Sequence, residues 1–242
     1  MMENRLNNLS IAQSVEQILD NIAKTCALCG RDASDVQLMA VTKTVEAQRV
    51  NEAIHAGVRL LGENRAQELL AKYDDYEKDG VDIHFIGHLQ TNKVRQIVDK
   101  VTMIQSLDSV ALAQEIERQC ENHDKKMNCL VEVNIGSELS KSGVAPDRLS
   151  DFLGELSGFG RICVRGLMAI PPVSGTDAEK ERYFSGMHKL FVDIRDKKLD
   201  NINMDFLSMG MSDDYLLAIK HGSNLVRLGT RLFGHRDYGP AK

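Results

Sequence analysis

The sequence predicts a single (β/α)8 barrel of the TIM type, with one extra helix at its amino end. Short apolar segments of strand length alternate with amphipathic helical segments, and this alternation continues to the carboxyl end. The apolar segments predict a parallel sheet that is covered by helices. The length of 242 residues is close to the roughly 250 residues of such a barrel. We therefore interpret residues 1–242 as one domain.

An amphipathic helix opens the chain, because apolar residues recur there at the spacing of one helical face. They are Ile11, Val15, Ile18, Leu19 and Ile22. Eight strand candidates follow, each a short apolar run. They are residues 36–42, 58–61, 83–86, 103–107, 129–133, 163–169, 205–209 and 225–228.

Helix signals lie between these strand candidates. A polar helix over 45–56 ends at Gly57. Pro146 stands in the first turn of another helix, and Thr176 with Glu179 forms a capping box before a third. Eight such units without a long linker favour closure into a barrel. An open, doubly wound sheet is the alternative fold.

Composition excludes several classes of protein. The net charge of −5 offers no strong field to nucleic acid or to anionic lipid. The amino end lacks the apolar core of a signal peptide, and no apolar run reaches the ~20 residues that span a bilayer. Five cysteines in no pattern suit a reducing compartment better than a disulfide framework. We expect a cytoplasmic protein that binds neither membrane nor nucleic acid.

Lys43 is the first candidate for chemistry, because it directly follows the first strand in the segment AVTKT. Active sites of these barrels lie at the carboxyl ends of the strands. A lysine that is partly desolvated there can attack an aldehyde as a neutral amine and form an imine. Position alone leaves a second interpretation open, in which Lys43 is an exposed residue at the start of a loop.

The loops after the last two strands predict an anion site. Ser212 lies at a helix amino terminus, where free backbone N–H groups favour an anion. Gly229 allows a ligand to approach the backbone closely, and Thr230 adds a hydroxyl donor. These two loops are the usual phosphate site of the fold. Each feature alone also fits a helix cap or a tight turn, but together with Lys43 they favour a phosphorylated aldehyde.

Motifs along most of the chain carry a specific resemblance. They are AVTKT at 40–44, GENRAQE at 62–68, HFIGHLQTNK at 84–93, SLDS at 106–109, VNIGSELSKSG at 134–143, GLMAIPP at 166–172, LSMGMSDD at 207–214 and VRLGTRLFG at 226–234. In this order they resemble the YggS/PROSC family of pyridoxal phosphate homeostasis proteins. The fold of that family is similar to the barrel domain of alanine racemase and other fold-type III pyridoxal phosphate enzymes.

The resemblance implies a pyridoxal 5′-phosphate (PLP) site. By this resemblance Lys43 is the Schiff-base lysine, and Ser212, Gly229 and Thr230 contact the phosphate. Arg227 faces the pyridine nitrogen, which makes the cofactor a weaker electron sink than an aspartate at that place would.

Asn64 lies near the cofactor ring by the same resemblance.

Other residues are weaker candidates for a functional role. His84 and His88 have a spacing seen in metal sites, but no helix carries both, so we expect no metal and place His84 at the barrel mouth. Glu138 and Lys141 follow the fifth strand and could line the site or pair with each other.

Three functions are compatible with a reactive lysine in such a barrel. The first is a PLP carrier for vitamin B6 homeostasis with little or no turnover, which passes its cofactor to apo enzymes. The second is a fold-type III amino-acid racemase or related PLP enzyme, and the third is an aldolase-like imine catalyst. Fold-type III enzymes carry a second, mostly β domain that the sequence lacks. We therefore expect a monomeric carrier without catalytic residues.

Overall fold

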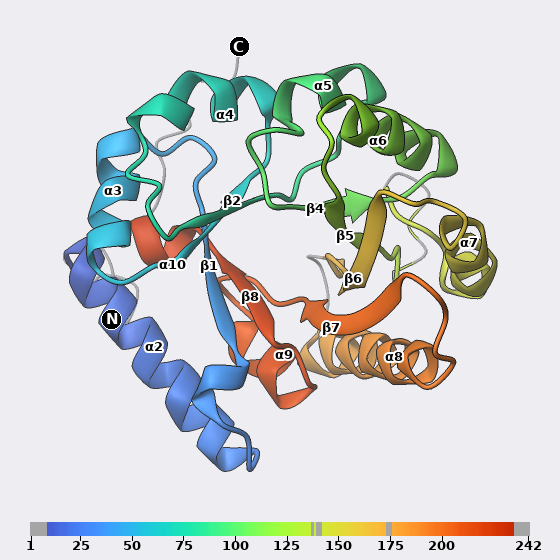
Figure 1. Ribbon diagram of the computed structural model, residues 1–242. Coiled ribbons are helices and arrows are strands. Elements are labelled where there is room, and N and C mark those ends of the chain that lie inside the picture. Colours follow the sequence, from blue (N-terminus) through green and yellow to red (C-terminus); the bar gives the residue numbers. More distant parts are fainter. Residues whose placement is uncertain (1–8, 137, 139–141, 173–175, 235–242) are drawn as a thin grey trace.

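Eight parallel strands close into a barrel in the order β1 to β8. The computed structural model describes residues 9–136, 138, 142–172 and 176–234. Helices surround the ring of strands (Figure 1). The ring is closed where β1 pairs with β8, with Gln37 opposite Leu225 and Ala40 opposite Leu228. This pairing confirms the barrel and excludes the open sheet.

The strands have the following bounds. They are β1 (Gln37–Val41), β2 (Leu60–Glu63), β3 (Asp82–Phe85), β4 (Met103–Leu107), β5 (Met127–Glu132), β6 (Ile162–Met168), β7 (Ile202–Ser208) and β8 (Leu225–Leu228).

The helices that accompany them vary in length from one turn to five. They are α2 (Ile11–Leu28), α3 (Ala47–His55), α4 (Ala66–Lys72), α5 (Val94–Ile97), α6 (Val110–Asn122), α7 (Leu149–Leu156), α8 (Asp177–Arg195), α9 (Tyr215–Lys220) and α10 (Thr230–Phe233). Short 3-10 turns are η1 (Ala33–Asp35), η2 (Tyr73–Asp75), η3 (Thr91–Lys93) and η4 (Pro146–Arg148). Within the described ranges, no helix is both long and apolar enough to cross a bilayer.

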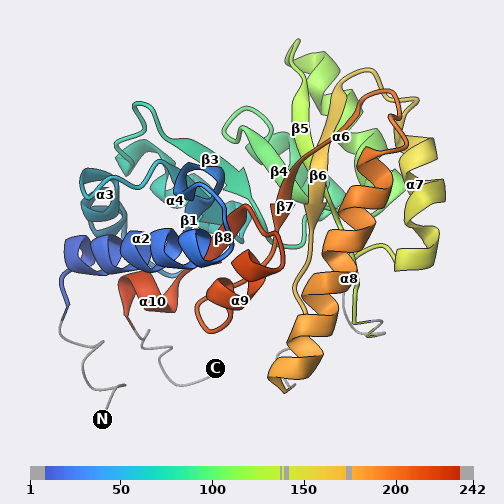
Figure 2. The same cartoon turned by 90° about the horizontal axis from the view of Figure 1, so that it is seen from below.

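The expected amino-terminal helix is α2. A reciprocal capping box between Ser10 and Gln13 starts it. Its apolar face, which includes Val15 and Ile18, is buried and packs against α3, α9 and α10 (Figure 2). The capping box of Thr176 and Glu179 likewise starts α8, as predicted.

Some element boundaries differ from the predictions, for example where an apolar residue is buried in a turn and does not pair in a strand. The second strand begins at Leu60 and runs to Glu63, two residues later than expected. Val58 is buried in the preceding turn, and Arg59 donates there to the carbonyls of Ile54 and Val58. Pro146 begins the 3-10 turn η4 rather than α7 itself.

The interior of the barrel is mostly apolar but contains a buried polar row. Met39, Val41 and Leu225 belong to one of its apolar clusters. Four polar side chains are also buried on strands β3, β4, β7 and β8, namely His84, Gln105, Ser208 and Arg227. Buried polar groups require hydrogen-bond partners, and these residues supply them to one another, as described below.

Candidate functional site

Lys43 lies two residues after the end of β1, where it is half-buried. Among the residues that the structure describes, its side chain has no hydrogen-bond or ion-pair partner. The next residue, Thr44, has a φ of 58°, which is unfavourable for a β-branched side chain. Its N–H donates to Glu68 Oε2 at 2.7 Å. A strained turn held by α4 therefore positions an unpaired lysine at the carboxyl end of the barrel.

A buried carboxylate supports this end of β1 and β2. Glu63 is fully buried. Its Oε1 accepts from Thr42 Oγ1 at 2.6 Å and from the Tyr76 hydroxyl at 2.5 Å. Lys72 Nζ lies 3.2 Å from the same oxygen. Burial, with the Glu63 charge nearby, raises the pKa of Tyr76. No local pattern in the sequence marks Glu63 as a supporting residue, because its partners come from separate elements.

Asn64 follows β2 and is half-buried. Its side-chain Oδ1 is buried and has no hydrogen-bond partner in the described part of the chain. A buried acceptor without a donor is costly, so this oxygen fits a ligand or water that donates to it. The backbone oxygen of Asn64 packs so tightly that a Cβ on Gly87 would lie 2.1 Å from it.

The loop after β7 and the start of α10 are joined by Ser212. Its Oγ accepts from Arg231 N at 3.2 Å, and its carbonyl accepts from Arg231 Nε at 3.0 Å. Gly229 is the buried N-cap of α10, and the exposed Thr230 is its first residue. The structure thus brings Ser212, Gly229 and Thr230 together at the ends of two neighbouring strands.

The position of Ser212 relative to α9 differs in detail from the prediction. Asp214 is the N-cap of α9, and its Oδ1 accepts from Met211 N at 2.7 Å. Ser212 therefore lies two residues before the cap. Its hydroxyl is directed to α10 rather than to α9, because the tertiary contact with Arg231 competes with local capping.

Arg227 on β8 is only 3% exposed. Its Nη1 donates to Ser208 Oγ at 2.7 Å, and its Nη2 donates to the carbonyl of Ala169 at 2.9 Å. Burial lowers the pKa of Arg227 to about 10, while the charges of Glu132 and Asp214 oppose that shift. The guanidinium is therefore still a cation at neutral pH.

Similarity to one protein family covers most of the chain. The model described as "Alanine racemase, N-terminal domain" matches residues 14–237. The chain belongs to this family. The expected resemblance to the barrel of alanine racemase is confirmed.

Three curated relatives that align with this chain over nearly their whole length carry one name. The chain is 37% identical to the pyridoxal phosphate homeostasis protein of Pasteurella multocida, over 95% of this chain and 99% of that protein. It is 36% identical to the protein of that name from Aquifex aeolicus, over 95% of this chain and 100% of the relative. The corresponding Escherichia coli protein is also 36% identical, over 94% and 97% of the two chains.

Solved structures agree with this assignment. A protein of unknown function from Bifidobacterium adolescentis has a TM-score of 0.88 at 34% identity, over 92% of this chain and 94% of that one. PipY of Synechococcus elongatus with PLP bound has a TM-score of 0.76 at 34% identity, over 88% and 100% of the two chains. An alanine racemase of Clostridium difficile shares the fold, with a TM-score of 0.72 at 16% identity over 93% of this chain and 57% of the racemase.

Two secondary predictions have different outcomes. The expected place of His84 at the barrel mouth is wrong. His84 is buried in the barrel interior, where it bonds to Gln105 and lines a pocket formed at the amino ends of the strands. Glu138 N donates to Asn134 Oδ1 at 3.2 Å, whereas Lys141 lies outside the described residues.

Proposed function

We propose that this protein binds PLP at the carboxyl end of its barrel and serves PLP homeostasis, with Lys43 as the Schiff-base lysine. The observation that carries the proposal is the half-buried, unpaired side chain of Lys43 at the end of β1. The names of the relatives and the PLP-bound PipY structure support the choice of cofactor. When bound, PLP supplies an aldehyde that condenses with an amine and a ring that withdraws electrons.

The described residues fit this cofactor. Ser212, Gly229 and Thr230 would hold the phosphate through hydroxyl and backbone N–H donors. Asn64 would use its unpaired Oδ1 near the ring. Arg227 would lie at the pyridine nitrogen, where a permanent cation disfavours protonation of that nitrogen. Such a site holds the cofactor while weakening it as an electron sink, which supports a carrier with little or no catalytic turnover.

The first experiment measures the visible absorbance of the purified protein mixed with PLP. We expect an absorbance band that borohydride removes, and peptide mapping should place the reduced adduct on Lys43. Lys43→Ala should lose both signals. Lys24→Ala is the control, because Lys24 is an exposed residue of α2 that pairs with Asp20, far from the proposed site. An adduct on another lysine, or none, would contradict the role of Lys43.

A second experiment separates a carrier from an enzyme. The loaded protein is mixed with an apo PLP enzyme, and recovery of that enzyme's activity is followed over time. It is also incubated with L-alanine to look for racemisation. We expect transfer and no racemisation above background. Fast racemisation would favour the racemase alternative, and failure to transfer PLP to any apo enzyme would contradict the carrier function.

We further propose that the protein is a cytoplasmic monomer. Light scattering measures its mass in solution and so tests whether it is a monomer.

A further inference from the structure

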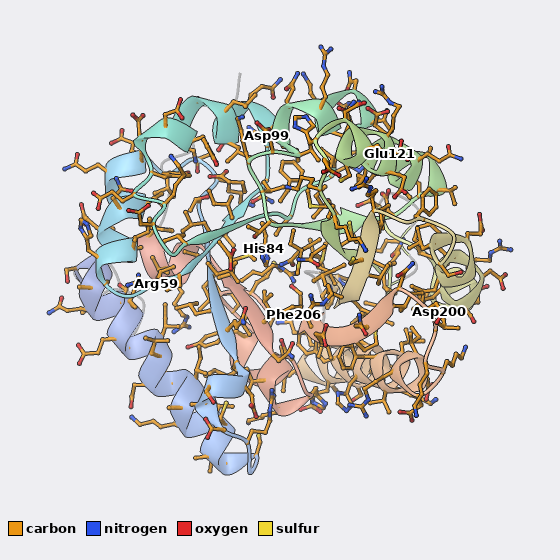
Figure 3. The ribbon with its side chains drawn as sticks, viewed as in Figure 1. Arg59, His84, Asp99, Glu121, Asp200 and Phe206 are labelled. Atoms are coloured by element: carbon orange, nitrogen blue, oxygen red, sulfur yellow. The ribbon has the colours of Figure 1, made fainter. Side chains whose placement is uncertain are left out.

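A pocket of about 450 Å³ opens at the amino ends of the strands, the opposite end from Lys43. Its walls are apolar where Leu38, Leu60, Met103 and Phe206 line it, and α2 covers one side with Val15 and Leu19. Figure 3 shows His84 and Phe206 within the ring of strands and Arg59 in the loop before β2. The volume suits a ligand the size of one substituted ring.

A chain of hydrogen bonds crosses the barrel and ends at this pocket. Arg227 Nη1 donates to Ser208 Oγ at 2.7 Å, and Ser208 Oγ donates to Gln105 Oε1 at 2.8 Å. The amide Nε2 of Gln105 lies 2.9 Å from His84 Nδ1. An arginine can only donate, so the serine proton is directed to Gln105 and the glutamine amide to His84. His84 Nδ1 is therefore an acceptor, and the ring proton is on Nε2.

His84 has a donor that the protein does not satisfy. The side chain is 5% exposed, and desolvation lowers its pKa to about 3, so the ring is neutral at physiological pH. No residue in the described ranges pairs with Nε2, although His84 lines the pocket. A nearly buried N–H without an acceptor is unfavourable. The pocket therefore requires an acceptor, either from water or from a ligand.

Two guanidinium groups lie at the same pocket. Arg165 Nε donates to Asp205 at 2.5 Å, and its two terminal nitrogens have no partner among the residues described. Arg59 Nη1 donates to the carbonyl of Ile54 in α3 and to that of Val58 in the following turn. Asp82 also lines the pocket and offsets one of these two positive charges, while Asp205 pairs with Arg165 outside the lining. Such a balance suits a single negative charge better than a doubly charged phosphate.

We propose that this pocket binds a small monocarboxylate with an apolar, ring-sized body. The carboxylate accepts the Nε2 proton of His84, and the guanidinium groups of Arg59 and Arg165 attract it. The apolar body lies against Leu60 and Phe206. This site is separate from the proposed PLP site, and its occupancy does not depend on Lys43.

Benzoate is the probe that tests the pocket. We expect benzoate, added to the full chain without PLP, to shift the ring resonances of His84 and Phe206 in NMR spectra. Benzylamine, which has the same ring and the opposite charge, should cause no such shifts. Benzoate shifts centred on Ser212 and Thr230 instead would mean that the anion occupies the other end of the barrel, and this would overturn the proposal.

Calorimetry on two arginine variants tests the affinity of the pocket for benzoate. Arg165→Met should weaken benzoate binding about tenfold, as expected for the loss of one charge-assisted contact. Arg161→Met is the matched control, because Arg161 also pairs with an aspartate, Asp124 at 2.9 Å, and does not line the pocket. The two side chains are similarly exposed, 37% for Arg165 and 35% for Arg161. Equal affinity of the two variants would refute the site.

Discussion

At the scale of single residues, His84 shows how burial decides protonation. An unperturbed histidine has a pKa near 6.5, whereas desolvation lowers the pKa of His84 to about 3. Between these two values the unfolded chain binds a proton that the folded chain does not. The stability of the fold therefore falls as the pH falls through this window.

We expect His84→Gln to reduce this acid sensitivity. Between pH 6 and pH 4, the free energy of unfolding of the unmodified protein should contain a component of about 1.4 kcal/mol per pH unit from His84. The variant should lack it, whatever its stability at pH 7. Urea unfolding at several pH values measures this slope. His123→Gln, at an exposed helix end, should keep the original slope, and an unchanged slope in His84→Gln would contradict the assignment.

At Lys43 and Thr44, the local sequence indicates the site but not the residues that hold it in place. The position of Lys43 after a strand follows from the order of residues. The strained backbone of Thr44 persists because Glu68, 24 residues later, accepts its N–H. We interpret this contact as the device that holds the lysine in place.

At the scale of elements, the turns between strands and helices need glycine at particular points. A Cβ on Gly87 would collide with the backbone oxygen of Asn64 at 2.1 Å. Gly154 on α7 has open space around its position. Two glycine-to-alanine changes therefore have opposite expected effects.

We expect Gly87→Ala to lower the free energy of unfolding by about 2–4 kcal/mol, because backbone must shift to relieve the collision. Gly154→Ala should raise it by about 0.5–1 kcal/mol, because alanine favours an exposed helix interior. Thermal or urea unfolding compares the two. Gly87→Ala should also weaken PLP retention through Asn64. Equal effects of both substitutions would show that the β2–α4 and β3–η3 turns are looser than described.

The loops after β7 and β8 form a second unit at this scale. Ser212→Ala combined with Thr230→Ala should weaken PLP retention by about 1–3 kcal/mol for each charge-assisted hydrogen bond lost. Dialysis of the loaded protein, followed by its absorbance, measures the retention. Ser157→Ala, at the exposed end of α7, is the control. Unchanged retention in the double variant would remove these loops from the phosphate site.

Most elements were predictable because their signals are local. The capping box of Thr176 and Glu179, for example, is a start signal that lies within four consecutive residues at the beginning of α8. The ends of β2 and β7 were not predictable to the residue. Val58 is apolar but does not pair with a neighbouring strand. Strand β7 begins at Ile202, three residues before its expected start, in a segment where apolar and polar side chains alternate.

At the scale of the whole molecule, the hydrogen-bond chain ties together strands from both halves of the barrel. Gln105 on β4 bonds to His84 on β3 and to Ser208 on β7, which in turn bonds to Arg227 on β8. Removal of Gln105 leaves the buried Nδ1 of His84 without a donor and the hydroxyl proton of Ser208 without an acceptor. Each such group is costly inside a protein.

We expect Gln105→Met to lower the free energy of unfolding by about 2–4 kcal/mol. It should also release the fixed tautomer of His84, which nitrogen NMR of the ring can detect. Gln119→Met is the matched control, because Gln119 on α6 loses only its single bond to Glu115 at 2.7 Å. A tautomer unaffected by Gln105→Met would show that the chain does not direct the histidine proton.

The sequence by itself determined the eight-unit alternation and the positions of Lys43, Ser212, Gly229 and Thr230 after their strands. These are local properties, because strand ends and helix starts depend on neighbours within a few residues. Only the tertiary structure shows that the side-chain oxygen of Asn64 is unpaired, which buried groups Arg227 contacts, and that His84 lines a pocket at the amino ends of the strands. Ser208 and Gln105 are 103 residues apart, and no local pattern encodes which side chains meet across a barrel.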